Sequence, residues 1–209
     1  ACVFDRNHAE AEGGAFLEVS TGTVKMHACT FDGNRARVGG AVALQYGAMM
    51  EMHACVFDRN HAEVEGGAVI VTRGAGPCLL KMHACTFDGN RAQWSGAVAN
   101  YATMEMHSCT FVGNRAQWGG AVEAWKATMM EMHACAFDRN HAERQGGAVW
   151  NTEGPMKMYA CAFDRNHAEQ DGGAVYNVYD STMAVHGCNF TNCSAEVLLL
   201  PRSATSLRR

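Results

Sequence analysis

Eight cysteines recur along the chain, each two residues before a phenylalanine, and successive copies lie 24 to 30 residues apart. Thiols can form disulfides or act as reactive groups. Because these cysteines hold one repeat position, however, we expect them to stack in register as small, buried, apolar side chains, with disulfide bonds permitted but not required. Cys78 and Cys193 lie outside this row, and they are the better candidates for a disulfide or a reactive thiol.

Histidines form a second row, in which Tyr159 replaces one copy. Its members are His27, His53, His83, His107, His133 and His186. Imidazoles bind Zn²⁺ and Cu²⁺, but identical side chains in a straight row do not converge on a tetrahedral site. We therefore predict no metal site and no cofactor. Protonation of the row should cause repulsion and a modest loss of stability at about pH 5 to 6.

Carboxylates offer little sign of catalysis. Cleavage of glycosidic bonds needs acidic or basic side chains that converge on one patch. Nearly every aspartate is a repeat position, and the exceptions, Asp171 and Asp180, have no evident acidic partner. We predict no catalytic residues and expect that the chain is not an enzyme. A carbohydrate-active enzyme is the third functional alternative.

The elements that position these residues follow from the repeat. In the unit 24–42, apolar residues alternate at Val24 and Met26 and again at Cys29 and Phe31, which predicts two short strands with a bend at residues 27–28. A further strand is expected to begin at the Gly-Gly-Ala-Val of residues 39–42. Each unit thus has two or three strands, none of which can bury its apolar face alone. Stacked copies predict an all-β solenoid, a right-handed parallel β-helix of about seven coils.

A structural ladder should run through this solenoid, with asparagine amides hydrogen-bonded from coil to coil in the turn after each phenylalanine. Its members are Cys29, Phe31, Asn34, Cys55, Phe57, Asn60, Cys85, Phe87, Asn90, Cys109, Phe111, Asn114, Cys135, Phe137, Asn140, Cys161, Phe163 and Asn166. The repeat domain is predicted to span residues 1–193. Residues 194–209 leave the pattern and are expected to form a cap and a tail.

The segment after each Ala-Val varies in length and carries aromatic residues. In a solenoid, unequal insertions cluster on one face, which is often the binding face. The candidate binding face comprises Tyr46, Arg73, Tyr101, Trp125, Trp150, Tyr176 and Tyr179. Trp94 and Trp118 form a smaller aromatic pair in the shorter turns. Arginines on either side of the asparagines are expected to form surface ion pairs.

Composition narrows the partners. The formal charge of −4 is spread over the repeats, which argues against nucleic acid. No run approaches eighteen apolar residues, so we predict no membrane span, although a peripheral position on a membrane complex stays open.

The pattern C-x-F-x-x-N-x-A followed by G-G-A-V resembles the repeats of the chlamydial polymorphic outer membrane proteins, over almost the whole chain. The resemblance implies a right-handed β-helix displayed at the cell surface, with an adhesive role. The compartment is therefore expected to be extracellular or the cell surface, with an organelle lumen as the alternative. We expect a non-catalytic scaffold or surface-binding module whose partner is a protein or a glycan. An accessory subunit of a larger protein or membrane complex is the main alternative.

Overall fold

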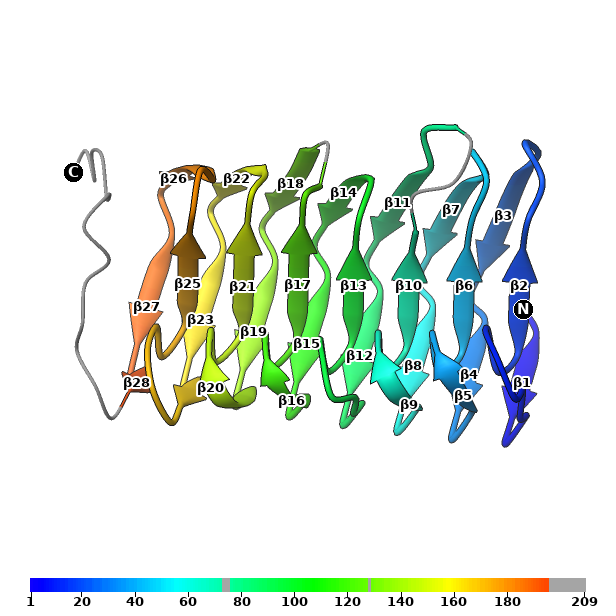
Figure 1. The fold of residues 1–209 in the computed structure, drawn as a ribbon, viewed down its shortest axis with the longest axis horizontal. Helices are drawn as coiled ribbons and strands as arrows, with labels where there is room; N and C mark the ends of the chain where they lie inside the picture. The colour runs from blue at the N-terminus through cyan, green and yellow to red at the C-terminus, as the bar shows by residue number, and fades with distance from the viewer. Residues whose placement is uncertain (73–75, 128, 196–209) are drawn as a thin grey trace.

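The computed structural model describes residues 1–72, 76–127 and 129–195. Every strand pair among these residues is parallel, and the chain winds into a right-handed parallel β-helix (Figure 1), which confirms the predicted fold. Equivalent residues of successive coils pair in register, as Phe4 does with Phe31. No helix long and apolar enough to cross a membrane occurs in the described part of the chain.

Four stacks of strands form the walls. The methionine sheet comprises β3 (Thr23–His27), β7 (Met49–His53), β11 (Leu79–His83), β14 (Thr103–His107), β18 (Met129–His133), β22 (Pro155–Tyr159) and β26 (Thr182–His186). The phenylalanine sheet comprises β1 (Val3–Asp5), β4 (Thr30–Asp32), β8 (Val56–Asp58), β12 (Thr86–Asp88), β15 (Thr110–Val112), β19 (Ala136–Asp138), β23 (Ala162–Asp164) and β27 (Asn189–Thr191).

The valine sheet comprises β2 (Phe16–Glu18), β6 (Val42–Leu44), β10 (Val69–Val71), β13 (Val98–Asn100), β17 (Val122–Trp125), β21 (Val149–Thr152) and β25 (Val175–Val178). The narrow wall comprises β5 (Arg35–Val38) and β9 (His61–Glu65), then β16 (Arg115–Trp118), β20 (His141–Gln145), β24 (His167–Ala168) and β28 (Ser194–Ala195). Single bridges through Arg91 and Trp94 join these two groups of strands. The narrow wall supplies a fourth strand to the coil, whereas the sequence predicted two or three strands in each unit.

Each coil passes from the methionine sheet to the phenylalanine sheet, then to the narrow wall and the valine sheet. The first corner lies where the alternation of apolar residues changes phase, and Ala28 adopts a φ of 50° there. The bend predicted at residues 27–28 is thus confirmed. β28 extends the narrow wall two residues past the predicted domain boundary at residue 193. The predicted cap and tail fall mainly on residues 196–209, outside the described residues.

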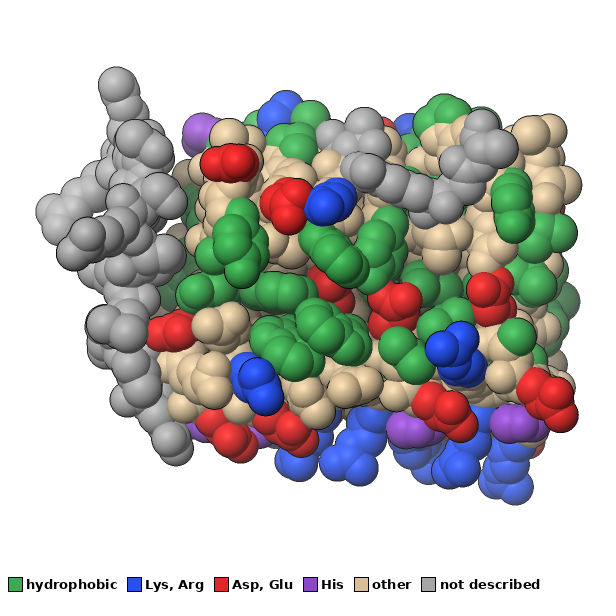
Figure 2. All heavy atoms as spheres, viewed as in Figure 1, with side chains coloured by type: hydrophobic (Ala, Val, Ile, Leu, Met, Phe, Trp, Pro, Cys, Tyr) green, Lys and Arg blue, Asp and Glu red, His purple; other side chains and the backbone are tan. Residues whose placement is uncertain are grey.

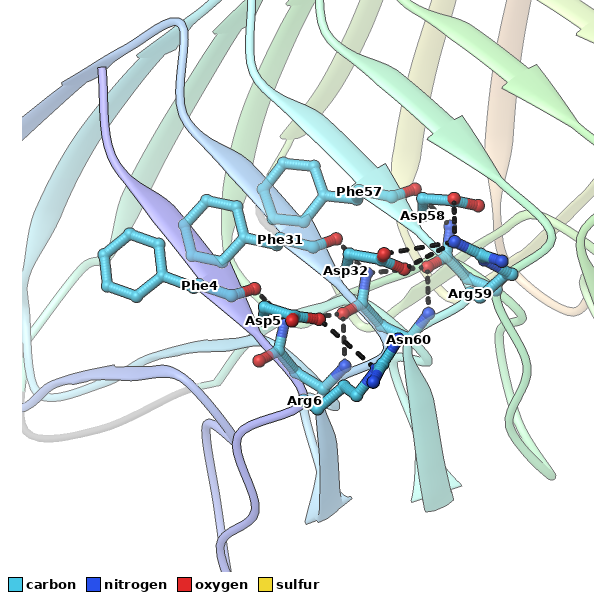
Figure 3. A network of polar contacts seen from close by, with 11 residues as sticks. Phe4, Asp5, Arg6, Phe31, Asp32, Phe57, Asp58, Arg59 and Asn60 are labelled. Atoms are coloured by element: carbon cyan, nitrogen blue, oxygen red, sulfur yellow. Dashed lines mark hydrogen bonds and ion pairs between the residues drawn. The ribbon is translucent and has the colours of Figure 1, made fainter.

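The interior is built from stacked identical side chains. Phenylalanine rings of neighbouring coils lie 4.6 to 4.8 Å apart and nearly parallel (Figure 3). Methionines of the methionine sheet and the cysteines before each phenylalanine complete this core. All ten cysteines are free thiols. Cys78 and Cys193, which the sequence suggested as candidates for a disulfide, therefore form none. The predicted stacking of cysteine and phenylalanine is confirmed.

Asparagine side chains close the turn between the phenylalanine sheet and the narrow wall. Asn60 Oδ1 accepts hydrogen bonds from the backbone N–H and from Nδ2 of Asn34, both at 3.0 Å. Asn60 Nδ2 in turn donates to Asn90 Oδ1 at 3.0 Å and to the Phe31 carbonyl at 3.0 Å. The asparagines from Asn34 to Asn166 are fully buried, and these bonds satisfy polar groups that burial would otherwise penalise. The predicted asparagine ladder is confirmed.

The two glycines before each Ala-Val have different tasks. The first adopts a positive φ in most coils, 59° at Gly39, and Ser95 takes its place with a φ of 55°. The second packs against the next coil: a Cβ at Gly40 would lie 2.1 Å from the carbonyl oxygen of Gly67, and one at Gly120 equally close to Gly147. Only glycine allows the coils to approach this closely at the second position.

The histidine row lies along one edge of the methionine sheet. Ring centroids from His27 to His133 are 4.7 to 4.8 Å apart and nearly parallel. Beside it, Lys25 pairs with Glu51 at 2.9 Å and Lys81 with Glu105 at 2.8 Å. Burial lowers the pKa of His83, with contributions from the neighbouring histidines and Lys81.

We predict that Gly120→Ala lowers the free energy of unfolding by about 3 kcal/mol or more, because its Cβ would overlap backbone that cannot move independently. Gly187→Ala is the matched control. Gly187 has a φ of 62° but nothing within 4 Å of an added Cβ, and alanine or serine occupies this bend in the six preceding coils. Urea unfolding measures both. Equal effects of the two substitutions would show that coil contact does not set the requirement for glycine.

We also predict that the parent loses stability relative to His83→Gln as the pH falls from 7 to 5. The pKa of His83 is lower in the folded protein than the ordinary value of about 6.5, so the unfolded chain takes up a proton first and unfolding is favoured below that pH. Melting temperatures of the two proteins across this range test the effect. A difference that does not change with pH would contradict it.

Candidate functional site

The outer side of the valine sheet carries its own small cluster of side chains. In β6, Val42 and Leu44 point into the main core, whereas Ala43 joins Ile70 and Ala99 in a separate apolar group. The chain before each Gly-Gly folds back over this side. A Cβ on Gly39 would lie 2.7 Å from Ile70 Cγ2, for example. Side chains at the middle of the inner valine-sheet strands, such as Ala43, Ile70 and Ala99, are therefore buried although they point away from the main core.

Aromatic rings gather over this side in the middle coils. Trp94 and Trp118 stack with centroids 4.0 Å apart, and Trp150 is tilted against both at 5.8 and 6.3 Å. On the side nearer the methionine sheet, Tyr101 contacts Trp125 at 5.7 Å. We call these five residues the aromatic patch. Figure 2 shows hydrophobic side chains gathered in this region, with acidic side chains between them and Lys, Arg and His along the lower edge.

A buried carboxyl lies within the patch. Glu123 is fully buried in β17, next to Trp150 of the following coil, and neither of its oxygens has a hydrogen-bond partner among the described residues. Burial, with a smaller contribution from the Glu65 carboxylate, raises the pKa of Glu123 to about 8. Glu65 accepts a hydrogen bond from the Tyr101 hydroxyl. Glu123 is therefore largely protonated at neutral pH.

Cationic side chains flank the rings. The Arg144 guanidinium lies 4.8 Å from the centre of the Trp118 ring, and the Lys126 ammonium lies 5.7 Å from that of Trp125. Trp125 is 39 % exposed, whereas Trp150 is only 9 % exposed. The patch thus offers partly exposed ring faces with charged groups at their edges, which suits a ligand with both apolar and hydroxyl surfaces.

The predicted binding face is only partly assembled. Tyr101 contacts Trp125, Trp150 contacts Trp94 and Trp118 instead, and Tyr176 follows Trp150 in register. Trp94 and Trp118, expected as a separate pair, belong to the same side. Tyr46 and Tyr179 are 52 and 69 % exposed on turns, with no ring contact to the patch. Arg73 lies outside the described residues.

Glu123 and Glu65 were missed from the sequence. The sequence does contain a signal for Glu123. In the middle repeats it is the only charged residue directly after the Ala-Val, and the other repeats have Ala43, Ile70, Ala99 and Trp150 at this position. No comparable signal marked Glu65, whose position is polar or aromatic in several copies. In the described part of the chain, no group of three or more His, Cys, Asp or Glu side chains is arranged to hold a metal ion.

We predict that Glu123→Gln stabilises the protein increasingly as the pH rises from about 4.5 to 8. The pKa of Glu123 is higher folded than unfolded, so its contribution to stability is present below the unfolded pKa and is lost as the pH rises through about 8. The free energies of unfolding should diverge by up to about 1.4 kcal/mol per pH unit. Exposed Glu63 provides the control, since Glu63→Gln should show no such slope. A pH-independent difference for Glu123→Gln would rule out a neutral buried acid.

Comparison of the chain with protein-family models, curated proteins and solved structures found no match.

Proposed function

We propose that this chain is a rigid, non-catalytic surface-binding module that binds a glycan through the aromatic patch. The observation that carries the proposal is the presence of two ring clusters on the outer side of the valine sheet, one of Trp94, Trp118 and Trp150 and the other of Tyr101 and Trp125. Sugar rings present apolar faces that pack on aromatic rings, and their hydroxyls hydrogen-bond to charged and amide groups at the edges.

The fold supports this role because it holds the rings in place before a ligand arrives. Trp125 and Trp150 lie on strands that are paired on both sides. Trp118 lies on β16, which pairs with β20 on one side and is joined to the preceding coil by single bridges on the other. Little side-chain or backbone freedom is therefore lost on binding. Arg144 and Lys126 can donate hydrogen bonds to hydroxyl or ring oxygens.

Two features of the carboxyls favour binding over cleavage. Glu123 is covered from solvent and cannot exchange a proton directly with a ligand on the surface. One oxygen of Glu65 already accepts a hydrogen bond from Tyr101. Glycosidic cleavage needs two carboxyl groups that both reach the bond to be broken.

We predict that Trp118→Ala and Trp125→Ala each weaken glycan binding by about tenfold or more, as expected when a central aromatic side chain is removed from a binding surface. The full chain would be titrated against a panel of soluble neutral and acidic polysaccharides. Tyr179→Ala is the matched control, because it removes an exposed aromatic residue that makes no ring contact with the patch and should leave binding unchanged.

Two results would contradict the proposed function. One is the absence of binding to any polysaccharide of the panel by the folded parent. The other is unchanged binding by both tryptophan variants while they keep the parent's β-structure spectrum. A native mass far above 23 kDa after gentle extraction, together with no glycan binding, would instead support the accessory-subunit alternative.

A further inference from the structure

A row of basic side chains follows the outer side of the narrow wall. Each coil contributes one arginine or histidine at the same register position, and the pairing runs through His8, Arg35, His61, Arg91, Arg115, His141 and His167. The middle of the row lines an open groove. Adjacent coils in a parallel sheet are about 4.8 Å apart, so these side chains are close neighbours.

The arginines adjacent to the ladder asparagines fall into two classes. Those before the asparagine are neutralised: Arg59 lies 3.0 Å from Asp32 and 2.9 Å from Asp58, and Arg165 contacts Asp138 and Asp164 at 3.1 and 2.9 Å (Figure 3 shows the first case). Those after the asparagine are Arg35, Arg91 and Arg115, and none of them forms an ion pair with any described residue. The expected surface ion pairs are thus confirmed for the first class only.

Arg91 and Arg115 are also set apart by their surroundings. Copies with histidine in the row carry glutamate two residues later, as at Glu63 and Glu143, whereas the two copies reading R-A-Q-W carry Gln93 and Gln117. These adjacent coils have therefore gained a permanent cation and lost the acid beside it. Two stacked guanidinium groups repel each other, and a bound anion would remove that repulsion.

The other charged groups of the groove lie at its two ends, so the positive charge of Arg91 and Arg115 lies at its centre. Glu63 and Glu143 lie on the coils at either side, as do His61 and His141. Burial lowers the pKa of His61, and the positive charges of Arg35 and Arg91 lower it further. Burial also lowers the pKa of His141, and His167 and Arg115 add to the effect, whereas Glu169 raises this pKa. Both histidines are therefore mainly neutral at pH 7, and the fixed cations are Arg91 and Arg115.

We propose that Arg91 and Arg115 form a subsite for an acidic substituent, a carboxylate or a sulfate ester, on the glycan that occupies the aromatic patch. The inference rests on the proposed function and specifies its ligand as an acidic glycan. Trp94 and Trp118 follow these arginines by three residues in the same two coils, so one repeat variant supplies both the rings and the cations. Planar guanidinium groups bind carboxylate and sulfate oxygens through paired hydrogen bonds.

The test compares the parent with Arg91→Gln/Arg115→Gln and with Arg35→Gln/Arg37→Gln. The second double variant removes the same charge from β5 of the same wall, two coils from the nearer arginine, and so controls for general electrostatic attraction. The probes are polygalacturonate, a sulfated galactan and the neutral galactan, titrated at physiological salt. We expect the parent to bind at least one acidic polymer about tenfold or more tightly than the neutral one.

That preference should disappear in Arg91→Gln/Arg115→Gln and persist in Arg35→Gln/Arg37→Gln, while binding of the neutral polymer stays the same in all three proteins. Arg91→Lys/Arg115→Lys should restore part of the preference. An equal loss in both double variants would overturn the subsite in favour of diffuse attraction. Neutral binding without an acidic preference in the parent would overturn the subsite and leave the proposed function intact. No binding to any of the three polymers would overturn the subsite, and the proposed function too if the wider panel also gave none.

Discussion

The close approach of coils at the second glycine of each Gly-Gly governs this structure. At Gly14, Gly40, Gly67, Gly96, Gly120 and Gly147, an added Cβ would lie 2.0 to 2.2 Å from the carbonyl oxygen of the next coil's glycine. A coil can therefore move neither sideways nor out of register without breaking contacts on both sides. In-register stacking then follows for every other position, which is why identical side chains meet from coil to coil.

That register determines which residues the chain can vary. Inward positions must match their neighbours, because phenylalanine stacks on phenylalanine and each asparagine amide needs another amide to complete its hydrogen bonds. Outward positions have no such requirement. Differences between coils therefore accumulate on the outside, and the two adjacent R-A-Q-W copies place their arginines and tryptophans there without disturbing the interior.

The sequence was sufficient to predict the solenoid, the bend before each cysteine and the buried ladder, because these depend on a period and on residue types that repeat. It was not sufficient for the narrow wall, whose strands alternate around a single small residue such as Ala36 or Ala62 and resemble a loop in hydropathy. Nor could it show that the chain before Gly39 or Gly66 folds back over the valine sheet. The burial of Glu123 and the contact between the rings of Trp150 and Trp94 depend on the position of this segment.

The backbone hydrogen bonds between coils, such as that from the Arg59 N–H to the Asp88 carbonyl at 2.9 Å, run along the long axis of the rod (Figure 1). Tension applied between the two ends of the rod would thus be borne in full by every interface between coils, so coils would detach one at a time, each at a similar force. Tension applied across the rod at the aromatic patch would instead be shared among neighbouring coils. A rod built this way resists a sideways pull at the aromatic patch better than a pull on its own ends.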